Sequence, residues 1–529
     1  MPSDCISYQK SGYFSKLIVD YLDEKAILQP FYNRFPRLEN FEAQIVEKQK
    51  NYNHSNRKTL VSQLEFQYKG LKTSSLTQKN IANLAFENTF TITTGHQLNL
   101  FTGPLYFLYK IISTINLTKE LQAKYPSYNF VPIYWMATED HDFEEINYFN
   151  FKGKKIRWNK ETKGGVGRLS TYELNKIFEA FEKELDAGTN SNTLKDLFKN
   201  AYLNHSNLSE ATRFLANELF GKYGLVILDA DVPELKKVFV PYAKAELLNE
   251  NSFTEVTKTI EKLNDYGIQV KPREINLFYL DTNLRERIVY EDSKYQINNT
   301  AISFSEAEIL IELENHPERF SPNVILRPLY QEVILPNLCY IGGGGEIAYW
   351  LELKSYFEKV SIPFPMLLVR NSVLLVTEKQ VAKADKLKLS WHDLFLKQTD
   401  LRNKKATELS AFPINFSSQK SHLQLQFIAL LELAKQTAPS FLGAVKAQEA
   451  KQIKGLENLE KRLLKAQKQK YDSELDRITA LQNELFPNQS LQERQLNFSE
   501  FYLEFGDVLI EKLFKELKPL EQEFKIVIL

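Results

Sequence analysis

Residues 94–142 constrain the fold more than any other stretch, because strand-like and helix-like patterns alternate there. The run Asn88–Thr93 is rich in β-branched and aromatic residues and stops at Gly95, as a buried strand does when it ends in a turn. Pro104 suits a first helical position, and apolar residues then recur at near-helical spacing. Asn129–Thr138 supplies the next strand. The pattern predicts two successive strand–helix units of an α/β fold.

Polar residues follow each of these two strands. His96, Gln97, Asn99 and Thr102 follow the first strand, and the acidic cluster Glu139–Asp142 follows the second. In an open α/β sheet, ligands bind beyond the carboxyl ends of the strands. We therefore expect both loops to face one cleft.

The acidic cluster supplies the candidate catalytic residues, Glu139, Asp140 and His141. They could poise the histidine as an acid or base, bind a divalent cation, or receive a substrate ammonium group, so a metal requirement stays open. A solvated helix start, in which Asp142 complements the helix dipole, explains part of the cluster without any function. We expect Asp140 to be needed for activity and Glu145, on the helix beyond, to matter little.

Four consecutive glycines, Gly342–Gly345, form the second informative stretch. Ordering glycine costs entropy, so a fold keeps such a run where the backbone turns sharply or approaches something closely. We expect a helix to start at Glu346, and its first N–H groups would favour a phosphate or carboxylate, held also by Arg327. A tight turn packed on a neighbouring strand is the alternative. Arg370 ends the predicted strand Phe364–Val369 and places another polar group at a strand end.

The candidate substrate-binding residues come from these loops and the segments beside them. They are Gln97, Asn99, Thr102, Gly103, Tyr106, Asp142, Arg327, Gln331, Gly342, Gly343, Gly344, Gly345, Glu346, Tyr349 and Arg370.

An NADP-dependent oxidoreductase is one alternative function. Residues 343–348 match the dinucleotide-binding pattern, with Ala348 in the third glycine position. The next strand ends at Arg370 rather than at an acidic residue, so only a cofactor with a 2′-phosphate would suit the site. A phosphate-loop NTPase is disfavoured, because no Gly-Lys-Ser/Thr follows the glycines.

Further runs extend the predicted core over residues 1–385, with insertions near 151–222 and 232–272. Leu225–Asp231 is a short continuous apolar run, as expected of a parallel strand covered on both faces. Pro233–Leu263 is predicted helical and Arg273–Asp281 is predicted to form another strand. Arg273 could bind an anion, but we favour an exposed or paired surface position.

From Leu387 onward, Lys, Glu, Gln and Leu dominate, and residues 386–520 are predicted to form an α-helical coiled-coil domain. Leu464, Tyr471, Ile478 and Leu485 recur every seven residues. We expect an antiparallel hairpin whose returning helix is Phe501–Leu517, and a homodimer that buries the apolar seam. Residues 521–529 should contain a strand that returns to the core.

Composition narrows the functional classes. Lys+Arg and Asp+Glu both total 67, which disfavours nucleic acid as a partner. Cys5 and Cys339 are too few for a disulfide framework, and we expect Cys339 to be inert core. No apolar run is long enough to cross a bilayer and the start lacks a signal-peptide pattern, so we expect a cytoplasmic protein without a membrane partner.

Taken together, four ordered phrases resemble the BshC family, the cysteine-adding ligases of bacillithiol biosynthesis. They lie at residues 94–106, 135–143, 327–332 and 340–350, and shorter matches at residues 272–276 and 485–494 extend the likeness over most of the chain. His96 departs from the glutamine expected in many relatives, so no catalytic role is assigned to it.

The resemblance implies a Rossmann-like parallel-sheet core similar to the nucleotidyltransferases, two connecting-peptide insertions and a coiled coil used for homodimerisation. It also implies that L-cysteine is joined through its carboxylate to the amine of glucosaminyl-malate, giving a low-molecular-weight thiol. Amide formation in water is unfavourable, so ATP or another nucleoside triphosphate is the expected driving cosubstrate. A coiled-coil scaffold with a ligand-binding sheet domain is the remaining alternative.

Overall fold

The computed structural model describes residues 4–529 and divides them into two compact units. The larger unit comprises residues 4–374 together with Gln492–Val527, and the smaller unit comprises Leu375–Leu491. The division at residues 374 and 375 lies eleven residues before the boundary expected from composition.

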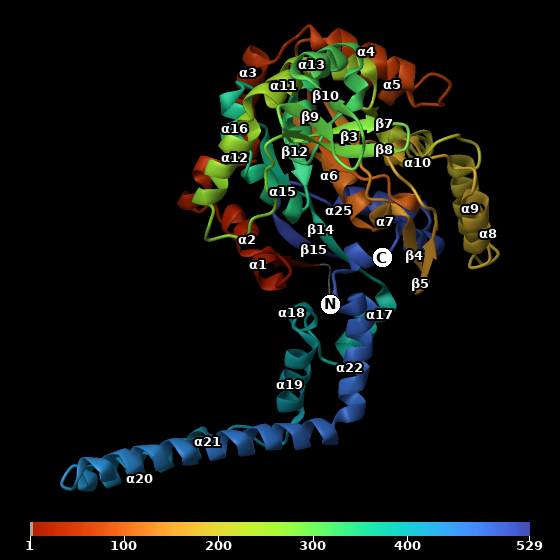
Figure 1. Ribbon diagram of the computed structural model, residues 1–529. Coiled ribbons are helices and arrows are strands. Elements are labelled where there is room, and N and C mark those ends of the chain that lie inside the picture. The colour runs from red at the N-terminus through yellow and green to blue at the C-terminus, as the bar shows by residue number, and fades with distance from the viewer. Residues whose placement is uncertain (1–3) are drawn as a thin grey trace. The chain divides into compact units, whose positions relative to one another are not determined.

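A five-stranded parallel sheet forms the centre of the larger unit (Figure 1). In spatial order its strands are β13 (Met366–Val369), β12 (Asn337–Gly342), β2 (Thr89–His96), β3 (Asn129–Met136) and β6 (Val226–Asp229). Every neighbouring pair is parallel. Numbered along the chain, these strands follow the order 3-2-1-4-5, which is the Rossmann arrangement. The order reverses between β2 and β12, where such sheets bind ligands.

Helices cover the sheet because its strands are apolar on both faces. All eight residues of β2 are buried, as expected for a central parallel strand. Helix α6 (Tyr106–Lys124) packs on β2 and β3, and α3 (Phe41–Asn51) packs on β12. The resulting core contains Phe41, Ile45, Phe90, Ile92, Leu117, Leu121, Phe130, Leu338, Cys339, Ile341, Met366 and Leu368.

The remaining helices of the larger unit surround this core or connect its strands. They include α1 (Tyr8–Ser11), α2 (Lys16–Leu22), α4 (Asn56–Gln67), α5 (Ser75–Asn83), α7 (Phe143–Ile146), α8 (Leu174–Glu182), α9 (Thr189–Tyr202), α10 (Leu208–Phe220), α11 (Pro233–Asn249), α12 (Asn251–Lys262), α13 (Glu306–Asn315), α14 (Leu326–Ile334), α15 (Gly344–Leu351), α16 (Lys354–Lys359), α23 (Gln492–Gln495), α24 (Phe498–Phe505) and α25 (Asp507–Glu516).

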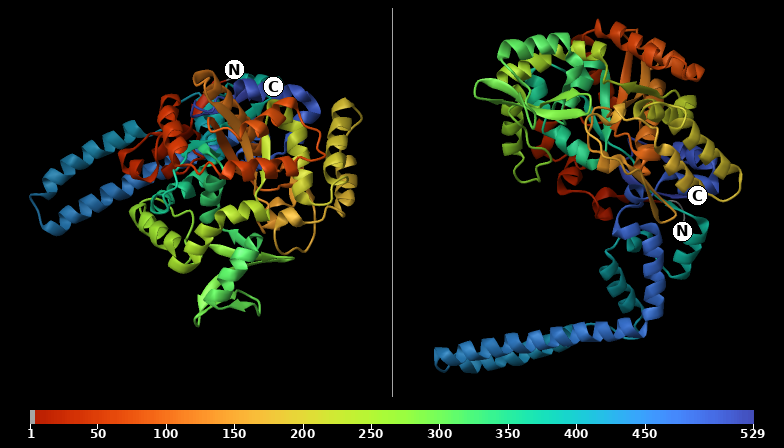
Figure 2. Two further views of the ribbon diagram at one scale, coloured as in Figure 1. Left: turned by 90° about the horizontal axis from the view of Figure 1, so that it is seen from above. Right: turned by 45° about the vertical axis from the view of Figure 1, so that its right-hand side comes forward.

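A second sheet is antiparallel and belongs to the same unit. Its order is β10 (Ser303–Phe304), β9 (Lys294–Ile297), β8 (Leu284–Glu291), β7 (Leu277–Asp281) and β11 (Phe320–Pro322). The strand predicted from Arg273 is β7, but it pairs here and not in the parallel sheet. Figure 2 shows these green strands standing apart from the orange strands β2 and β3.

Two smaller sheets complete the strand pairing. Strands β4 (Tyr148–Phe151) and β5 (Lys154–Arg157) form a hairpin within the first insertion. Strand β15 (Glu523–Ile528) pairs antiparallel with β1 (Asp4–Ser7), and β14 (Ser372–Val376) borders β15 on its other side.

The smaller unit is helical. It contains α17 (Glu378–Lys386), α18 (Trp391–Leu394), α19 (Gln398–Leu409), α20 (Ser417–Ala434), α21 (Pro439–Lys470) and α22 (Asp472–Leu485). Figure 1 shows α20 and α21 side by side as a long hairpin, joined through Phe427, Ala434 and Val445.

The expected pairing of this hairpin was wrong. The predicted returning helix, Phe501–Leu517, corresponds to α24 and α25, which pack on α9 and α6 in the larger unit. Its apolar residues therefore contribute to the sheet domain, and the partner of α21 is the preceding helix α20. The heptad residues Ile478 and Leu485 are buried within the chain, where α22 packs on α17 and α19.

Candidate active site

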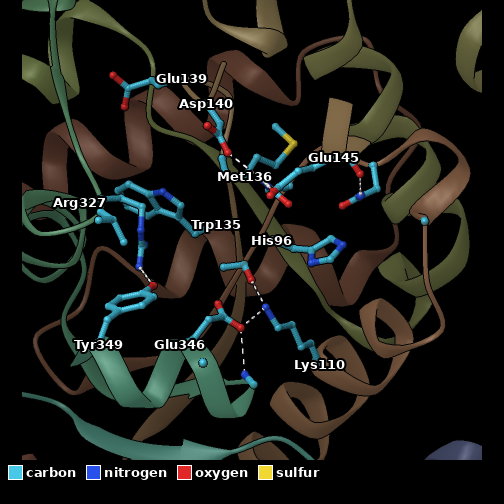
Figure 3. A pocket seen from close by; sticks show the side chains of 18 of the residues that line it. His96, Lys110, Trp135, Met136, Glu139, Asp140, Glu145, Arg327, Glu346 and Tyr349 are labelled. Atoms are coloured by element: carbon cyan, nitrogen blue, oxygen red, sulfur yellow. Dashed lines mark hydrogen bonds and ion pairs between the residues drawn. The ribbon is translucent and has the colours of Figure 1, made fainter. Parts of the chain in front are cut away.

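A cavity of about 960 Å³ opens at the carboxyl ends of β2, β3 and β12 (Figure 3). Residues Gly95 and His96 line it from the end of β2, Trp135 and Met136 from the end of β3, and Gly343 from the turn after β12. The cavity therefore lies where the strand order reverses, which is the position that the fold-level rule assigns to a ligand.

One side of the cavity is acidic. The side-chain amide of Gln97 donates to Asp140 Oδ2 over 2.9 Å and to Glu145 Oε2 over 2.8 Å. Two carboxylates therefore approach one amide group, and each retains further acceptor capacity. A cation with several N–H donors, such as a substrate ammonium, would neutralise both.

Glu139 lies apart from this pair. Its carboxylate forms an ion pair with Lys236, whose side chain is 1% exposed and which also donates to the carbonyl of Phe320 over 2.9 Å. Figure 3 shows Glu139 directed away from Asp140 and Glu145. Glu139 lines the cavity, but its charge is already compensated by the protein.

His141 is held as a neutral imidazole. Arg285 Nη1 lies 2.6 Å from His141 Nδ1, so the guanidinium donates and Nδ1 accepts. Burial, followed by the charge of Arg285, lowers the pKa of His141. The proton of the neutral ring is consequently on Nε2, which can act as a hydrogen-bond donor.

The glycine run leads into helix α15, whose first turn contains the carboxylate of Glu346. Helix α15 starts at Gly344, two residues before the predicted start, and Glu346 accepts a hydrogen bond from the Gly343 N–H over 2.9 Å. Glu346 also accepts from Tyr340 Oη over 2.6 Å and pairs with Lys110 Nζ over 2.5 Å. Lys110 donates in addition to the carbonyl of Gly95 over 2.7 Å.

The pKa of Glu346 reflects these contacts. Burial raises the pKa of the carboxyl group, but Lys110, Tyr340 and the Gly343 N–H outweigh it, and the pKa is lowered. Glu346 is therefore ionised, and its carboxylate accepts the hydrogen bond that the Gly343 N–H donates.

Two arginines approach the cavity beside this turn. Arg327 donates to Tyr349 Oη and to Gln331 Oε1, both over 3.1 Å. Arg370 donates through Nη2 to the buried carboxylate of Glu493 over 2.6 Å. The Nε of Arg370 is buried and has no hydrogen-bond partner among residues 4–529. Since a Cβ on Gly343 would lie 3.7 Å from that Nε, the free donor faces the glycine turn.

Most of the predicted site residues line this cavity. Those that do are Gln97, Asn99, Gly103, Tyr106, Glu139, Asp140, His141, Arg327, Gly343, Gly344, Gly345, Glu346, Tyr349 and Arg370. The other predicted residues lie beside it: Thr102 is buried, Asp142 is exposed before α7, Gln331 is buried against Arg327, and Gly342 ends β12.

Several lining residues were not assigned to the site from sequence. They include Lys110, Tyr148, Lys271, Arg285, Arg287, Tyr340 and Arg494. Glu145, which was expected to matter little, and Arg273, for which a surface position was favoured over anion binding, also line the cavity. A signal existed for Lys110, since it is a single cation in the apolar run of α6. His96 also lines the cavity, and burial, Lys110 and Arg370 lower its pKa well below the usual value.

Three further features of the described residues concern metal binding, membrane-spanning helices and the state of Cys339. Among residues 4–529, no group of three or more His, Cys, Asp or Glu side chains is arranged to hold a metal ion. Within that same range, no helix has the length and apolar character needed to cross a membrane. Cys339 is fully buried in the core, and burial raises its pKa well above the usual value.

The parallel sheet and its strand order define a Rossmann-like protein, with a polar cavity at the point where the strand order reverses. The BshC N-terminal Rossmann-like domain of bacillithiol biosynthesis matches residues 1–371, and the BshC C-terminal coiled-coil domain matches residues 373–529. The chain belongs to the BshC family.

Individual relatives agree with this assignment. A protein of Flavobacterium johnsoniae named "Putative cysteine ligase BshC" is 67% identical over 100% of both chains. A protein of the same name from Bacillus cytotoxicus is 30% identical over 89% of this chain and 91% of its own. The chain was also compared with solved structures. A crystal structure described as a "putative arginyl T-RNA synthetase" from Campylobacter jejuni covers 84% of this chain and 98% of its own, with 13% identity and a TM-score of 0.22.

Proposed function

We propose that this protein is a ligase that joins the carboxylate of L-cysteine to the amine of glucosaminyl-malate through an amide bond. The observation that carries the proposal is the polarity of the cavity. Asp140 and Glu145 converge on Gln97 at one side, while Arg327 and Arg370 approach the glycine turn at another. Such a cavity suits an amine and a carboxylate held together.

The acidic pair would bind the amine substrate as an ammonium ion and orient it. An amine attacks a carboxyl carbon only as the free base, so one proton must leave the ammonium group before the bond forms. Asp140 and Glu145 are positioned to accept that proton, whereas His141 has its Nδ1 occupied by Arg285. His141 Nε2–H would instead donate to an oxygen of a substrate.

The basic side would bind the carboxylate of cysteine and a nucleoside triphosphate. The free Nε of Arg370 and the open space around Gly345, where a Cβ would meet nothing within 4 Å, fit an anionic group beside the start of α15. The triphosphate would supply the free energy of amide formation. Arg327 would hold negative charge of the ligand, whereas Lys110 is paired with Glu346. The Gly343 N–H is not available to the ligand, because it donates to Glu346.

The alternative oxidoreductase is less well supported. A dinucleotide phosphate at this turn would need the N–H groups that the pattern provides, yet Gly343 N–H donates to Glu346. Relatives that match 89% to 100% of the chain also bear the name of a ligase. A cytoplasmic location, where cysteine and nucleotides are present, is part of the proposal.

Turnover provides the test. Purified protein is incubated with L-cysteine, glucosaminyl-malate and ATP, with GTP in a parallel reaction, and the product mass and nucleotide fate are followed. A product whose mass equals the two substrates less one water, formed together with nucleotide cleavage, supports the proposal. Oxidation of NADPH without such a product contradicts it.

A further inference from the structure

The antiparallel sheet and the segment before it contribute a group of cations to the cavity. Lys271 and Arg273 precede β7, and Arg285 and Arg287 lie on β8; all four line the cavity. We call these four residues the basic wall. Arg285 and Arg287 belong to the antiparallel sheet and Lys271 and Arg273 to the segment before it, so all four lie outside the sheet that carries the glycine turn.

Arg285 is fixed in place by its surroundings. Its guanidinium carbon lies 4.1 Å from the centre of the Phe278 ring, and its Nε donates to Ser321 Oγ over 3.3 Å. Its Nη1 donates to His141. Arg285 therefore links the basic wall to the acidic cluster at a defined position.

The other members of the basic wall lack compensating charge. Among residues 4–529, no carboxylate lies within ion-pair distance of Lys271, Arg273 or Arg287. Cations gathered at a concave surface without anionic partners repel one another and raise the local positive potential. Such an arrangement attracts a ligand with more than one negative charge.

We propose that the basic wall binds the two carboxylates of the malate group of the amine substrate. This inference rests on the proposed function and assigns the substrate's two ends. The ammonium group would lie between Asp140 and Glu145, and the dicarboxylate would lie against Arg273, Arg287 and Lys271. Cysteine has a single carboxylate and the glycine turn offers it a separate position, so the wall would select the second substrate.

Phosphates of a nucleotide share this anionic chemistry, so the experiment must separate the two ligands. The test variant is Arg273→Gln/Arg287→Gln, since both side chains are exposed and neither supports the core. The control is Lys294→Gln, which removes an exposed cation from β9 of the same sheet but outside the cavity. Binding of glucosaminyl-malate, of glucosamine without malate, and of ATP is measured by titration calorimetry.

The expected result is selective. The Kd for glucosaminyl-malate should rise about tenfold in the double variant, because charge-assisted hydrogen bonds are lost, and should stay unchanged in the control. The Kd for glucosamine should be the same in all three proteins. A rise for ATP alone, or an equal rise for both amines, overturns the assignment.

Failure of the proposed function gives a different result. If the wild-type protein binds neither amine and forms no amide product, the ligase proposal and the basic-wall assignment both fall. If the wild-type protein forms the product while the double variant binds glucosaminyl-malate normally, only the assignment of the basic wall is overturned.

Discussion

The amide of Gln97 donates to the carboxylate of Glu145 over 2.8 Å, although 48 positions separate the two residues in the chain. The loop after β2 and the helix after β3 are thereby joined across the mouth of one cavity. Because Gln97 also donates to Asp140, Glu145 belongs to the acidic side and is no remote helix residue. Glu145 lies on the helix beyond β3, as expected, but the sequence did not indicate that its carboxylate lines the cavity.

The first prediction concerns this carboxylate pair. Asp140→Asn and Glu145→Gln should each lower amide formation at subsaturating amine substrate by about tenfold to a hundredfold, because each forfeits a charge-assisted hydrogen bond of about 1.5 to 3 kcal/mol. Glu144→Gln is the matched control, since Glu144 is on the same helix, pairs with the exposed Arg157 and lies outside the cavity. Initial rates are followed by product mass. Near-native rates in all three variants would contradict an ammonium site.

The second prediction separates the roles of two adjacent glycines. A Cβ at Gly345 would meet nothing within 4 Å, whereas a Cβ at Gly344 would lie 3.3 Å from Ile18 Cγ1. Gly345→Ala should therefore keep the wild-type Tm but weaken binding of the anionic substrate. Gly344→Ala should lower Tm, because Ile18 must move. Thermal unfolding and ligand titration of both variants check this, and normal affinity in Gly345→Ala would show that the glycine serves the turn alone.

The third prediction concerns association through the smaller unit. Leu425, Ile428 and Leu433 are 64%, 55% and 60% exposed on α20, and at about 100° of turn per residue none of them shares the face of Phe427, which packs on α21. We propose that a second copy of the chain covers this stripe. Leu425→Lys/Ile428→Lys should convert a homodimer into a monomer, measured by light scattering.

Controls distinguish association from folding. Val508→Lys changes an apolar side chain that is 58% exposed on α25 of the larger unit, and it should leave the mass of the assembly unchanged. Ile478→Lys should instead unfold the smaller unit, because Ile478 is 2% exposed within a single chain. A wild-type protein with the mass of a monomer would contradict the proposal.

The sequence predicted the fold where structure is decided locally. The apolar strands of the parallel sheet and the helix that follows Pro104 have patterns that persist over many residues, and the structure confirms them. The coiled-coil pairing failed because a heptad pattern, which here runs from α21 into α22, identifies an apolar face but not the helix that covers it. The ion pair of Glu139 could not be predicted either, because its partner Lys236 lies 97 positions away and only the fold brings the two together.

The last prediction concerns Lys110 and Glu346, whose ion pair supports the glycine turn from inside the cavity. The Lys110 side chain is 4% exposed, and its Nζ pairs with Glu346 and donates to the carbonyl of Gly95. The Glu346 side chain is 25% exposed and keeps its hydrogen bonds from Tyr340 and Gly343, so Lys110→Met should lower the free energy of unfolding of the larger unit by about 1 to 3 kcal/mol. Lys110→Met/Glu346→Gln should recover part of that loss, because no carboxylate is left without its cation. Denaturant unfolding of the two single variants and the double variant measures the coupling. Additive losses, or a Lys110→Met variant with wild-type stability and a raised KM for the anionic substrate, would show that Lys110 acts on the ligand and not on Glu346.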